Sequence, residues 1–307
     1  MTLQQLKYVV KTLECGSISR AATQLYISQP SLSSAIKELE NELKIIIFKR
    51  SSKGITLSSE GVEFLSYARQ IIEQTELLEQ HYKETKPSKQ LCTVSTQHYA
   101  FSVNAFVNLI QKSNTDEYKF TLRETRTYDI IKDVADMRSE IGILYISSFN
   151  KSIIYKFLSE NNLAFTQLFE AAPHVFVSKN NPLAQKQTLT LDDLQEYPCL
   201  SFEQGEYNSF YFSEEILSTV YHKKSILVSD RATLFNLLIG LNGYTICTGV
   251  LPPGLNGNDI ISIPLTSDEK LVVGWIVNKK TILSYPAKQY ILELKKIIKD
   301  YGFTILS

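Results

Sequence analysis

Residues 16–61 constrain the fold of this 307-residue chain more than any other segment. Two short stretches with apolar residues at helical spacing, 17–25 and 28–43, meet at a tight turn, and a basic hairpin containing Gly54 follows. Ser17 and Ser28 are good N-caps, and Pro30 falls in a first helical turn, where its missing N–H costs nothing. This order is the layout of a winged helix-turn-helix, which reads duplex DNA with one helix in the major groove.

The second of these helices has an apolar stripe and a polar face. Its stripe consists of Leu32, Ile36, Leu39 and Leu43. A polar face is ordinarily solvated surface, but the preceding helix, the tight turn and the hairpin favour contact with base edges and phosphates. The candidate DNA-binding residues of this helix and of the hairpin are Gln29, Pro30, Ser31, Ser33, Ser34, Lys37, Arg50 and Lys53.

Charge is segregated along the chain, although the whole sequence is neutral. Residues 1–58 hold eight Lys/Arg and four Glu, a net charge of +4, whereas residues 59–85 hold two Lys/Arg and six Glu, a net charge of −4. A basic segment suits the phosphate backbone of DNA, and the acidic segment after it does not.

These residues carry a resemblance to a known family. The runs GSISRAATQLYISQPSLSSAIKELENEL, IFKR and ITLSSEG resemble the DNA-binding domain of LysR-type transcriptional regulators, without gaps over residues 1–85. Ser58 departs from the family, which usually has Thr there, but both residues can cap a helix. The resemblance implies a homodimeric or homotetrameric regulator of transcription that binds double-stranded operator DNA and a small-molecule effector.

A long helix is expected over residues 59–86, after the winged domain of residues 1–58. Its apolar residues step by four and three, as in a heptad seam: Phe64, Ala68, Ile71, Thr75, Leu78 and Tyr82. Such a stripe can pack against its own domain or against the same helix of a second subunit. We favour the second subunit, because two half-sites give a small DNA-binding module useful affinity. A polar hinge, residues 86–89, then leads to the next domain.

Residues 90–307 alternate strands with helices, which predicts an α/β domain. The predicted elements include helices over residues 100–111 and 214–221 and a buried strand over residues 141–146. This part resembles the family's effector-binding domain, which is like a periplasmic binding protein with two α/β subdomains. The resemblance assigns residues 90–164 and 266–307 to subdomain I and residues 165–265 to subdomain II. The family usually has a Gly-x-x-Asp pattern before the third strand. In this chain Met137 stands in the Gly position and Glu140 in the Asp position.

Ligands in such folds sit at the carboxyl ends of strands and at helix N-termini, so the strand exits of both halves should line one cleft. The candidate effector-binding residues are Thr96, Gln97, His98, Thr125, Arg126, Tyr145, Phe202 and Thr248. Each of them can instead be an ordinary loop or capping residue. The Thr, Gln and Arg side chains suit a small polar anion such as an amino-acid-derived carboxylate. The chain also resembles the LysR-type regulators of methionine and cysteine supply.

Other classes of protein find little support. The sequence has no GxGxxG, Walker, HExxH or Gly-x-Ser-x-Gly motif, and the best catalytic candidate, a Cys199/His174 pair, has its cysteine inside a predicted strand. We expect no enzyme, cofactor or metal site. No apolar run approaches the roughly 20 residues that cross a bilayer, and no signal peptide is evident, so we expect a cytoplasmic protein with reduced cysteines. A redox pair of Cys199 and Cys247 and an effector-independent architectural DNA-binding protein are the alternatives.

Overall fold

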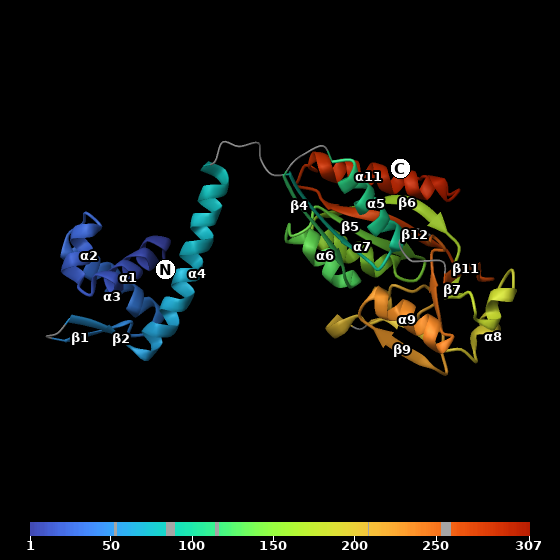
Figure 1. Ribbon diagram of the computed structural model, residues 1–307, viewed down its shortest axis with the longest axis horizontal. Helices are drawn as coiled ribbons and strands as arrows, with labels where there is room; N and C mark the ends of the chain where they lie inside the picture. Colours follow the sequence, from blue (N-terminus) through green and yellow to red (C-terminus); the bar gives the residue numbers. More distant parts are fainter. Residues whose placement is uncertain (52–53, 84–89, 114–116, 208, 253–258) are drawn as a thin grey trace. The chain divides into compact units, whose positions relative to one another are not determined.

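The computed structural model describes residues 1–51, 54–83, 90–113, 117–207, 209–252 and 259–307. The chain forms two compact units, Met1–Ser88 and Lys89–Ser307, and each has its own hydrophobic core (Figure 1). Among the described residues, no helix has the length and apolar character that a membrane crossing requires.

Three helices open the first unit: α1 (Leu3–Cys15), α2 (Ile18–Gln24) and α3 (Gln29–Leu43). The side chains of Ser17 and Ser28 accept hydrogen bonds from the backbone N–H groups of Arg20 and Ser31, so both predicted N-caps are confirmed. Gly16 ends α1 in the left-handed region (φ 64°), where glycine is favoured. The three helices share one core with the apolar stripe of α3.

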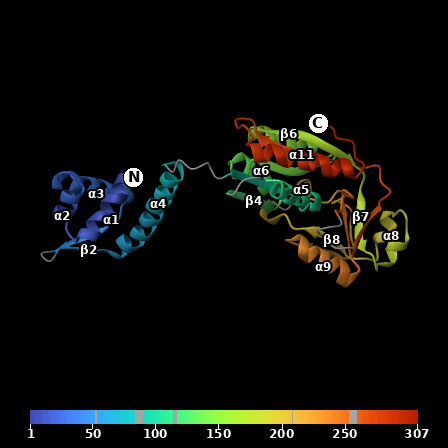
Figure 2. The same cartoon turned by 45° about the horizontal axis from the view of Figure 1, so that its top comes forward.

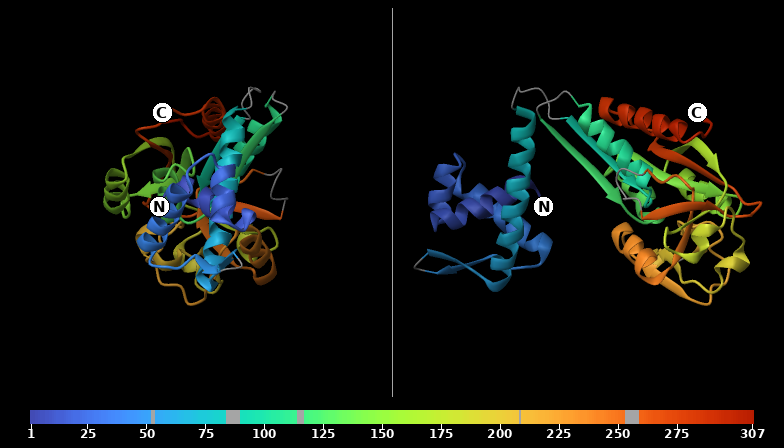
Figure 3. Two further views of the ribbon diagram at one scale, coloured as in Figure 1. Left: turned by 90° about the vertical axis from the view of Figure 1, so that its left-hand side faces the viewer. Right: turned by 45° about the vertical axis from the view of Figure 1, so that its right-hand side comes forward.

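A β-hairpin and a long helix complete this unit. Strands β1 (Phe48–Ser51) and β2 (Gly54–Leu57) pair antiparallel beside the first turns of α4 (Ser59–Lys83), as Figure 3 shows. The Ser58 hydroxyl accepts a hydrogen bond from the Gly61 N–H at 2.8 Å, so serine supplies the cap expected of threonine. A Cβ atom at Gly61 would lie 2.2 Å from the Ile47 carbonyl oxygen, which explains a glycine there.

The second unit contains two five-stranded sheets. The first has the order β4-β3-β5-β12-β6, and this sheet with its helices forms subdomain I. Its strands are β3 (Gln90–Thr96), β4 (Tyr118–Glu124), β5 (Ile141–Ser147), β6 (Leu163–Ala171) and β12 (Leu271–Asn278). Strand β3 runs parallel to β4 and β5, whereas β12 is antiparallel to β5 and β6.

Helices cover both faces of this first sheet. Helices α5 (Ala100–Gln111) and α11 (Tyr285–Asp300) lie side by side on one face, and α6 (Thr127–Ala135) and α7 (Lys151–Glu160) lie on the other (Figures 1 and 2). Strand β5 is buried along its whole length, with Ile143 and Leu144 in different core clusters. A strand covered on both faces reads as a continuous apolar run, as predicted for β5.

The second sheet has the order β11-β7-β10-β8-β9 and defines subdomain II. Its strands are β7 (His174–Ser178), β8 (Cys199–Phe202), β9 (Ser225–Val228), β10 (Tyr244–Cys247) and β11 (Ile260–Pro264). Helix α9 (Arg231–Leu241) packs on one face, and the core on the other face is continuous with that of subdomain I. The short helices α8 (Leu191–Leu194), η1 (Pro182–Gln185), η2 (Gly205–Tyr207) and η3 (Phe210–Phe212) lie in its connections. The predicted fold class, a winged helix-turn-helix, a long helix and two α/β halves, is confirmed.

Three local features differ from the expectations. Residues 214–221 form turns rather than a helix. The carboxylates of Glu214 and Glu215, at the start of this segment, accept buried hydrogen bonds from the backbone N–H groups of His98 and Phe202. Leu217 also adopts a left-handed conformation (φ 66°). Helix α7 was not predicted. The chain stays in the first sheet as far as Ala171, beyond the predicted crossing near residue 165, because β6 pairs with β12 over its whole length.

The departure from the Gly-x-x-Asp pattern has a structural account. Met137 adopts the left-handed conformation (φ 58°) that a glycine would tolerate more easily. The Glu140 carboxylate accepts hydrogen bonds from the backbone N–H and the hydroxyl of Ser284, at 2.9 and 3.0 Å, just before α11. The longer acid at this position therefore anchors the start of the last helix.

Candidate functional site

The polar face of α3 is open to solvent. Gln29 is the first residue of the helix, and Gln29, Pro30, Ser31, Ser34 and Lys37 are exposed, whereas Ser33 is half-buried. The face therefore presents short and flexible polar side chains of the kind that contact base edges. Their assignment to DNA contact stays a prediction.

Two residues outside the predicted DNA-binding set, Ser19 and Tyr26, lie beside this face. The Ser19 hydroxyl of α2 donates a hydrogen bond to the Gln29 side-chain oxygen at 3.1 Å, which leaves the amide group of Gln29 directed to other acceptors. Tyr26, in the turn between α2 and α3, has a left-handed backbone (φ 56°) and a side chain that is 96% exposed. A tyrosine exposed beside a basic helix-turn-helix is suited to a phosphate contact.

The hairpin carries the remaining candidates. Arg50 belongs to β1 and is paired in register with Ile55, and Lys53 lies outside the described residues. The neighbouring Lys49 is exposed on the same strand. Cations on such a hairpin can follow a phosphate backbone without reading its sequence.

We expect Gln29→Ala and Arg50→Ala to weaken DNA binding in different ways. Gln29→Ala should cost about 1–3 kcal/mol on the preferred site and relax preference at one base position. Arg50→Ala should weaken all sequences alike and lower the slope of log K against log salt by about 1. Fluorescence anisotropy with an operator and its single-base variants at several salt concentrations distinguishes them, with Gln74→Ala on α4 as the control. Unchanged affinity and base preference in Gln29→Ala would contradict its assignment.

Helix α4 uses its apolar residues in two ways. Near its start, Phe64 and Leu65 pack into the core of the first unit, and Ala68 is buried. Farther along, Ile71 and Leu78 are exposed, although both belong to the predicted heptad seam. The first turns therefore follow the alternative of packing against their own domain, and the later turns leave apolar side chains exposed.

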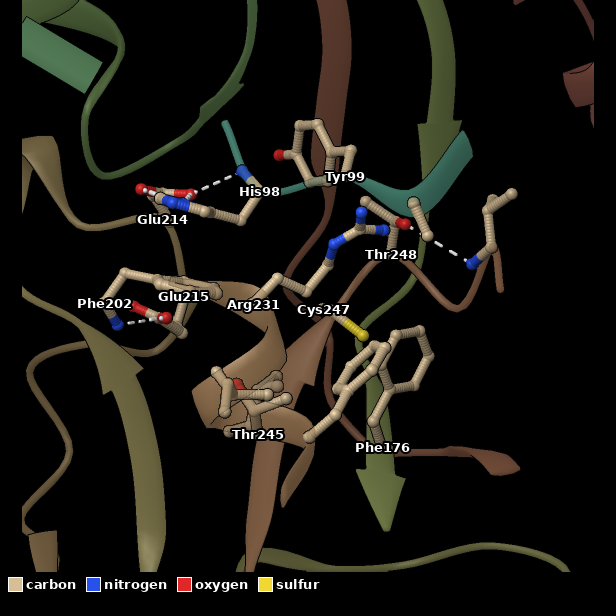
Figure 4. Close-up of a pocket in the computed structure, with 15 residues that line it drawn as sticks. His98, Tyr99, Phe176, Phe202, Glu214, Glu215, Arg231, Thr245, Cys247 and Thr248 are labelled. Atoms are coloured by element: carbon tan, nitrogen blue, oxygen red, sulfur yellow. Dashed lines mark hydrogen bonds and ion pairs between the residues drawn. The ribbon is translucent and has the colours of Figure 1, made fainter. Parts of the chain in front are cut away.

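A cavity of about 40 Å³ lies between the two sheets of the second unit (Figure 4). Subdomain I contributes the residues that follow β3, and subdomain II contributes β7, β8, β10, α9 and the segment after η3. The residues that line the cavity are His98, Tyr99, Ala100, Phe176, Phe202, Glu214, Glu215, Arg231, Leu234, Phe235, Thr245, Ile246, Cys247, Thr248 and Val250.

His98 joins the two subdomains across this cavity. Its backbone N–H donates to Glu214 Oε2 at 2.9 Å, and its ring Nδ1 lies 3.0 and 2.9 Å from the two carboxylate oxygens. Its ring also stacks on Phe202, with centroids 3.9 Å apart and an interplanar angle of 8°. Both side chains of the His98–Glu214 pair are nearly inaccessible to water, at 5% and 4% exposure.

Further polar contacts link the subdomains around His98. Arg231 Nε lies 3.2 Å from a carboxylate oxygen of Glu124, and the Tyr145 hydroxyl donates to the Glu215 carbonyl at 3.2 Å. An ion pair joins Arg126 and Glu203, both partly exposed. We call these contacts, together with the His98–Glu214 pair, the cross-cleft contacts.

Burial and charge shift the pKa values of the cleft residues. Burial alone would lower the pKa of His98, but its hydrogen bond to Glu214 and the charge of that carboxylate raise the pKa above its usual value. Burial, with a further contribution from the Glu214 charge, raises the pKa of Glu215 to about 8. The cleft therefore holds one carboxyl group that is mostly protonated at neutral pH.

The predicted effector-binding residues fall into two groups, those that line the cavity and those that surround it. Three of them line the cavity, namely His98, Phe202 and Thr248. The others surround it: Thr96, Gln97 and Tyr145 are buried, and Thr125 and Arg126 are half-buried.

Gln97 already has partners for its side-chain amide. Its oxygen accepts hydrogen bonds from the Tyr99 hydroxyl (2.9 Å) and the Tyr145 N–H (3.0 Å), and its nitrogen donates to the Thr127 hydroxyl (2.6 Å). The Thr96 hydroxyl donates to the Gln97 carbonyl at 2.8 Å. These residues support the wall of the cavity in this conformation, and their contact with an effector stays a prediction.

Sequence reasoning missed the charged residues that subdomain II contributes to the cavity and part of its aromatic lining. Glu214, Glu215, Arg231 and Phe176 line the cavity. The adjacent pair Glu214-Glu215, which stands between aromatic and apolar residues, was the sequence feature that could have indicated buried acids. The pair was instead assigned to a helix, where charged residues ordinarily face solvent.

The described residues offer no group of His, Cys, Asp and Glu side chains that could hold a metal ion. Cys15, Cys92, Cys199 and Cys247 are free thiols. Burial raises the pKa of Cys199 to about 12, although its hydrogen bond with Tyr244 acts in the opposite direction. A thiol with such a pKa is a poor nucleophile at neutral pH.

Comparison with known proteins identifies the family. Residues 3–62 match the family described as bacterial regulatory helix-turn-helix protein, lysR family, and residues 116–273 match the LysR substrate binding domain. These two segments cover more than half of the chain. The chain belongs to the LysR family. As a LysR-family protein it is a DNA-binding transcriptional regulator with an effector-binding domain and not an enzyme.

Relatives of this LysR-family regulator are distant in sequence. The uncharacterized transcriptional regulator YnfL of Escherichia coli K12 is 23% identical over 294 residues, 93% of this chain and 94% of that protein. The regulator CzcR of Bacillus subtilis is 27% identical over 208 residues, 67% of this chain and 65% of that protein. The solved structure of a Corynebacterium glutamicum OxyR C206 mutant has a TM-score of 0.54 at 18% identity, covering 98% of this chain and 94% of that one, and supports the fold.

Proposed function

We propose that a small polar metabolite binds in the cleft between the two subdomains and changes the affinity for operator DNA or the bend of that DNA. The observation that carries this proposal is the set of cross-cleft contacts around the cavity. A ligand changes a conformational equilibrium only by binding one state better than another. A molecule that replaces or reinforces the His98–Glu214 and Arg231–Glu124 contacts would have such a preference.

The proposed effector site comprises the cavity-lining His98, Phe202 and Thr248 and the surrounding Thr96, Gln97, Thr125, Arg126 and Tyr145. The proposed DNA-binding site is the exposed face of α3 with Arg50 and Lys53 of the hairpin. We further propose that subunits pair through α4, because its later turns expose apolar side chains such as Ile71 and Leu78. A dimer or tetramer then presents two recognition helices to one operator.

Regulation of methionine or cysteine supply is the pathway to test first, since the whole chain resembles regulators of those pathways. The competing function is an architectural DNA-binding protein without an effector. A cavity lined by buried ionisable groups between two subdomains favours the effector-dependent function, because DNA bending by itself requires no such cavity.

Mapping the DNA that the full-length protein protects around its own gene tests this proposal. We expect two protected half-sites separated by whole helical turns of about 10–10.5 base pairs. Sulphur amino acids and their precursors, added one at a time, should include one that changes the affinity by roughly 5–150-fold. Protection that no metabolite alters would support the architectural alternative.

A further inference from the structure

The carboxyl groups at the cleft differ in their partners. His98 lies against Glu214, and the Arg231 guanidinium lies against Glu124. Glu215 is 7% exposed, and its carboxylate accepts hydrogen bonds from the backbone N–H of Phe202, at 2.9 Å to Oε1, and from its own backbone N–H. A buried carboxylate without a counter-charge is costly, and the site would be more stable with a cation beside it.

The ionisable groups that act most directly on Glu215 carry no positive charge within the described residues, and His98 and Arg231, which line the same cavity, lie against Glu214 and Glu124. The groups that act on Glu215 are Glu214 beside it, Tyr99 and Tyr145 from subdomain I, and Cys199 and Cys247 from β8 and β10. Burial is the main cause that raises the pKa of each of these phenols and thiols, so they are uncharged at neutral pH. Burial and the neighbouring charge of Glu214 together raise the pKa of Glu215 to about 8, so its carboxyl group is mostly protonated at neutral pH.

The rest of the lining suits a cation as well. Phe176 and Phe202 line the cavity, as Figure 4 shows, and Phe235 lines it as well. The face of an aromatic ring attracts an ammonium or amidinium group. An anion would add to the charge of Glu214, and the Arg231 guanidinium already lies against Glu124. The volume of about 40 Å³ accommodates a charged headgroup of a few atoms, and the body of a larger ligand requires the cross-cleft contacts to open.

We propose that the effector carries a compact organic cation, a protonated amine or amidine, and that the Glu215 carboxylate receives it. This inference rests on the proposed function, because it specifies the ligand chemistry of the same cleft. It differs from the sequence-based expectation of an anion, although an amino-acid-derived effector satisfies it through its ammonium group. When the cation binds, Glu215 ionises and its proton passes to solvent.

Three probes of nearly the same shape but different charge test this assignment: benzylamine, benzyl alcohol and benzoate. Isothermal titration calorimetry on the full-length protein should show benzylamine binding about 10–100-fold more tightly than the other two, since each factor of ten corresponds to 1.4 kcal/mol. Glu215→Gln keeps a carbonyl oxygen for the Phe202 N–H but should abolish this preference. Glu196→Gln, the same change in an exposed carboxylate paired with Lys223, should preserve it.

Proton release provides a second readout that needs no variant. With a Glu215 pKa of about 8 before the ligand binds, benzylamine should release nearly one proton at pH 7, and its affinity should rise by up to about tenfold per pH unit between pH 6 and 8. The dependence of the binding enthalpy on the buffer measures this proton. Glu215→Gln should eliminate most of it, and any remainder reports His98, which faces Glu214, Glu124 and Arg231.

Three outcomes would overturn the charge assignment: benzoate binding as tightly as benzylamine, no binding of any probe, or equal benzylamine affinity in wild type and Glu215→Gln. The proposed function fails separately, when operator protection responds to no metabolite at all. A response to a purely anionic metabolite would retain the effector-dependent function and reject the cationic effector.

Discussion

Leu78→Glu in α4 is expected to yield smaller particles that bind operator DNA at least about 10²-fold more weakly. Leu78 is 58% exposed in the isolated chain, and Ile71, one heptad earlier, is 43% exposed. A glutamate at either position would place a charge in the proposed seam between subunits. Linking two DNA-binding modules raises affinity by about 10²–10⁴-fold through effective concentration, and this gain disappears when the modules separate.

Analytical ultracentrifugation and operator titration on the same preparations measure both effects. Gln70→Glu is the matched control, because it adds the same charge next to Ile71 on an exposed position outside the seam. An unchanged sedimentation coefficient in both Ile71→Glu and Leu78→Glu would show that the seam does not hold the subunits together.

The sequence alone predicts those parts of the structure that depend on residues close together along the chain. Ser17, Ser28 and Pro30 mark the helix starts of the winged domain because a cap and its N–H donor lie within three residues. The start and end of α5, Ala100 and Gln111, were likewise predicted, and so was the continuous burial of β5. In each case, spacing along the chain contains the information.

The cleft could not be predicted in the same way. Its main contact joins His98 to Glu214 across 116 positions of sequence, and the local sequence around Glu214 suits an exposed helical acid equally well. This contact also removes the predicted helix over 214–221, since the carboxylates at its start face inward. Long-range electrostatics therefore overrode a local helical pattern where the two subdomains meet.

The same contact gives the second large expected effect. Glu214→Gln keeps the shape of the side chain but removes the charge that balances His98. The backbone N–H and the ring of His98 contact both carboxylate oxygens of Glu214, and glutamine offers only one oxygen as an acceptor. We expect a loss of about 1–3 kcal/mol in the stability of the second unit, the cost of leaving a buried polar group unsatisfied. Trp275 in β12, the single tryptophan of the chain, reports unfolding of this unit by fluorescence.

The pH dependence of that loss distinguishes the ion pair from simple packing. Because the pKa of His98 is raised in the folded protein, the pair stabilises it fully below the ordinary value of 6.5, and this stability is lost as pH rises through the raised pKa. In Glu214→Gln, burial should instead lower the pKa of His98, so that acid destabilises the variant. The difference in unfolding free energy between wild type and Glu214→Gln should therefore be larger at pH 5.5 than at pH 8.5. Glu117→Gln, an exposed control in the same unit, should show no such trend. A difference that stays constant across this range would mean that His98 is neutral, and the two subdomains would then be held by hydrogen bonding and ring stacking without an ion pair.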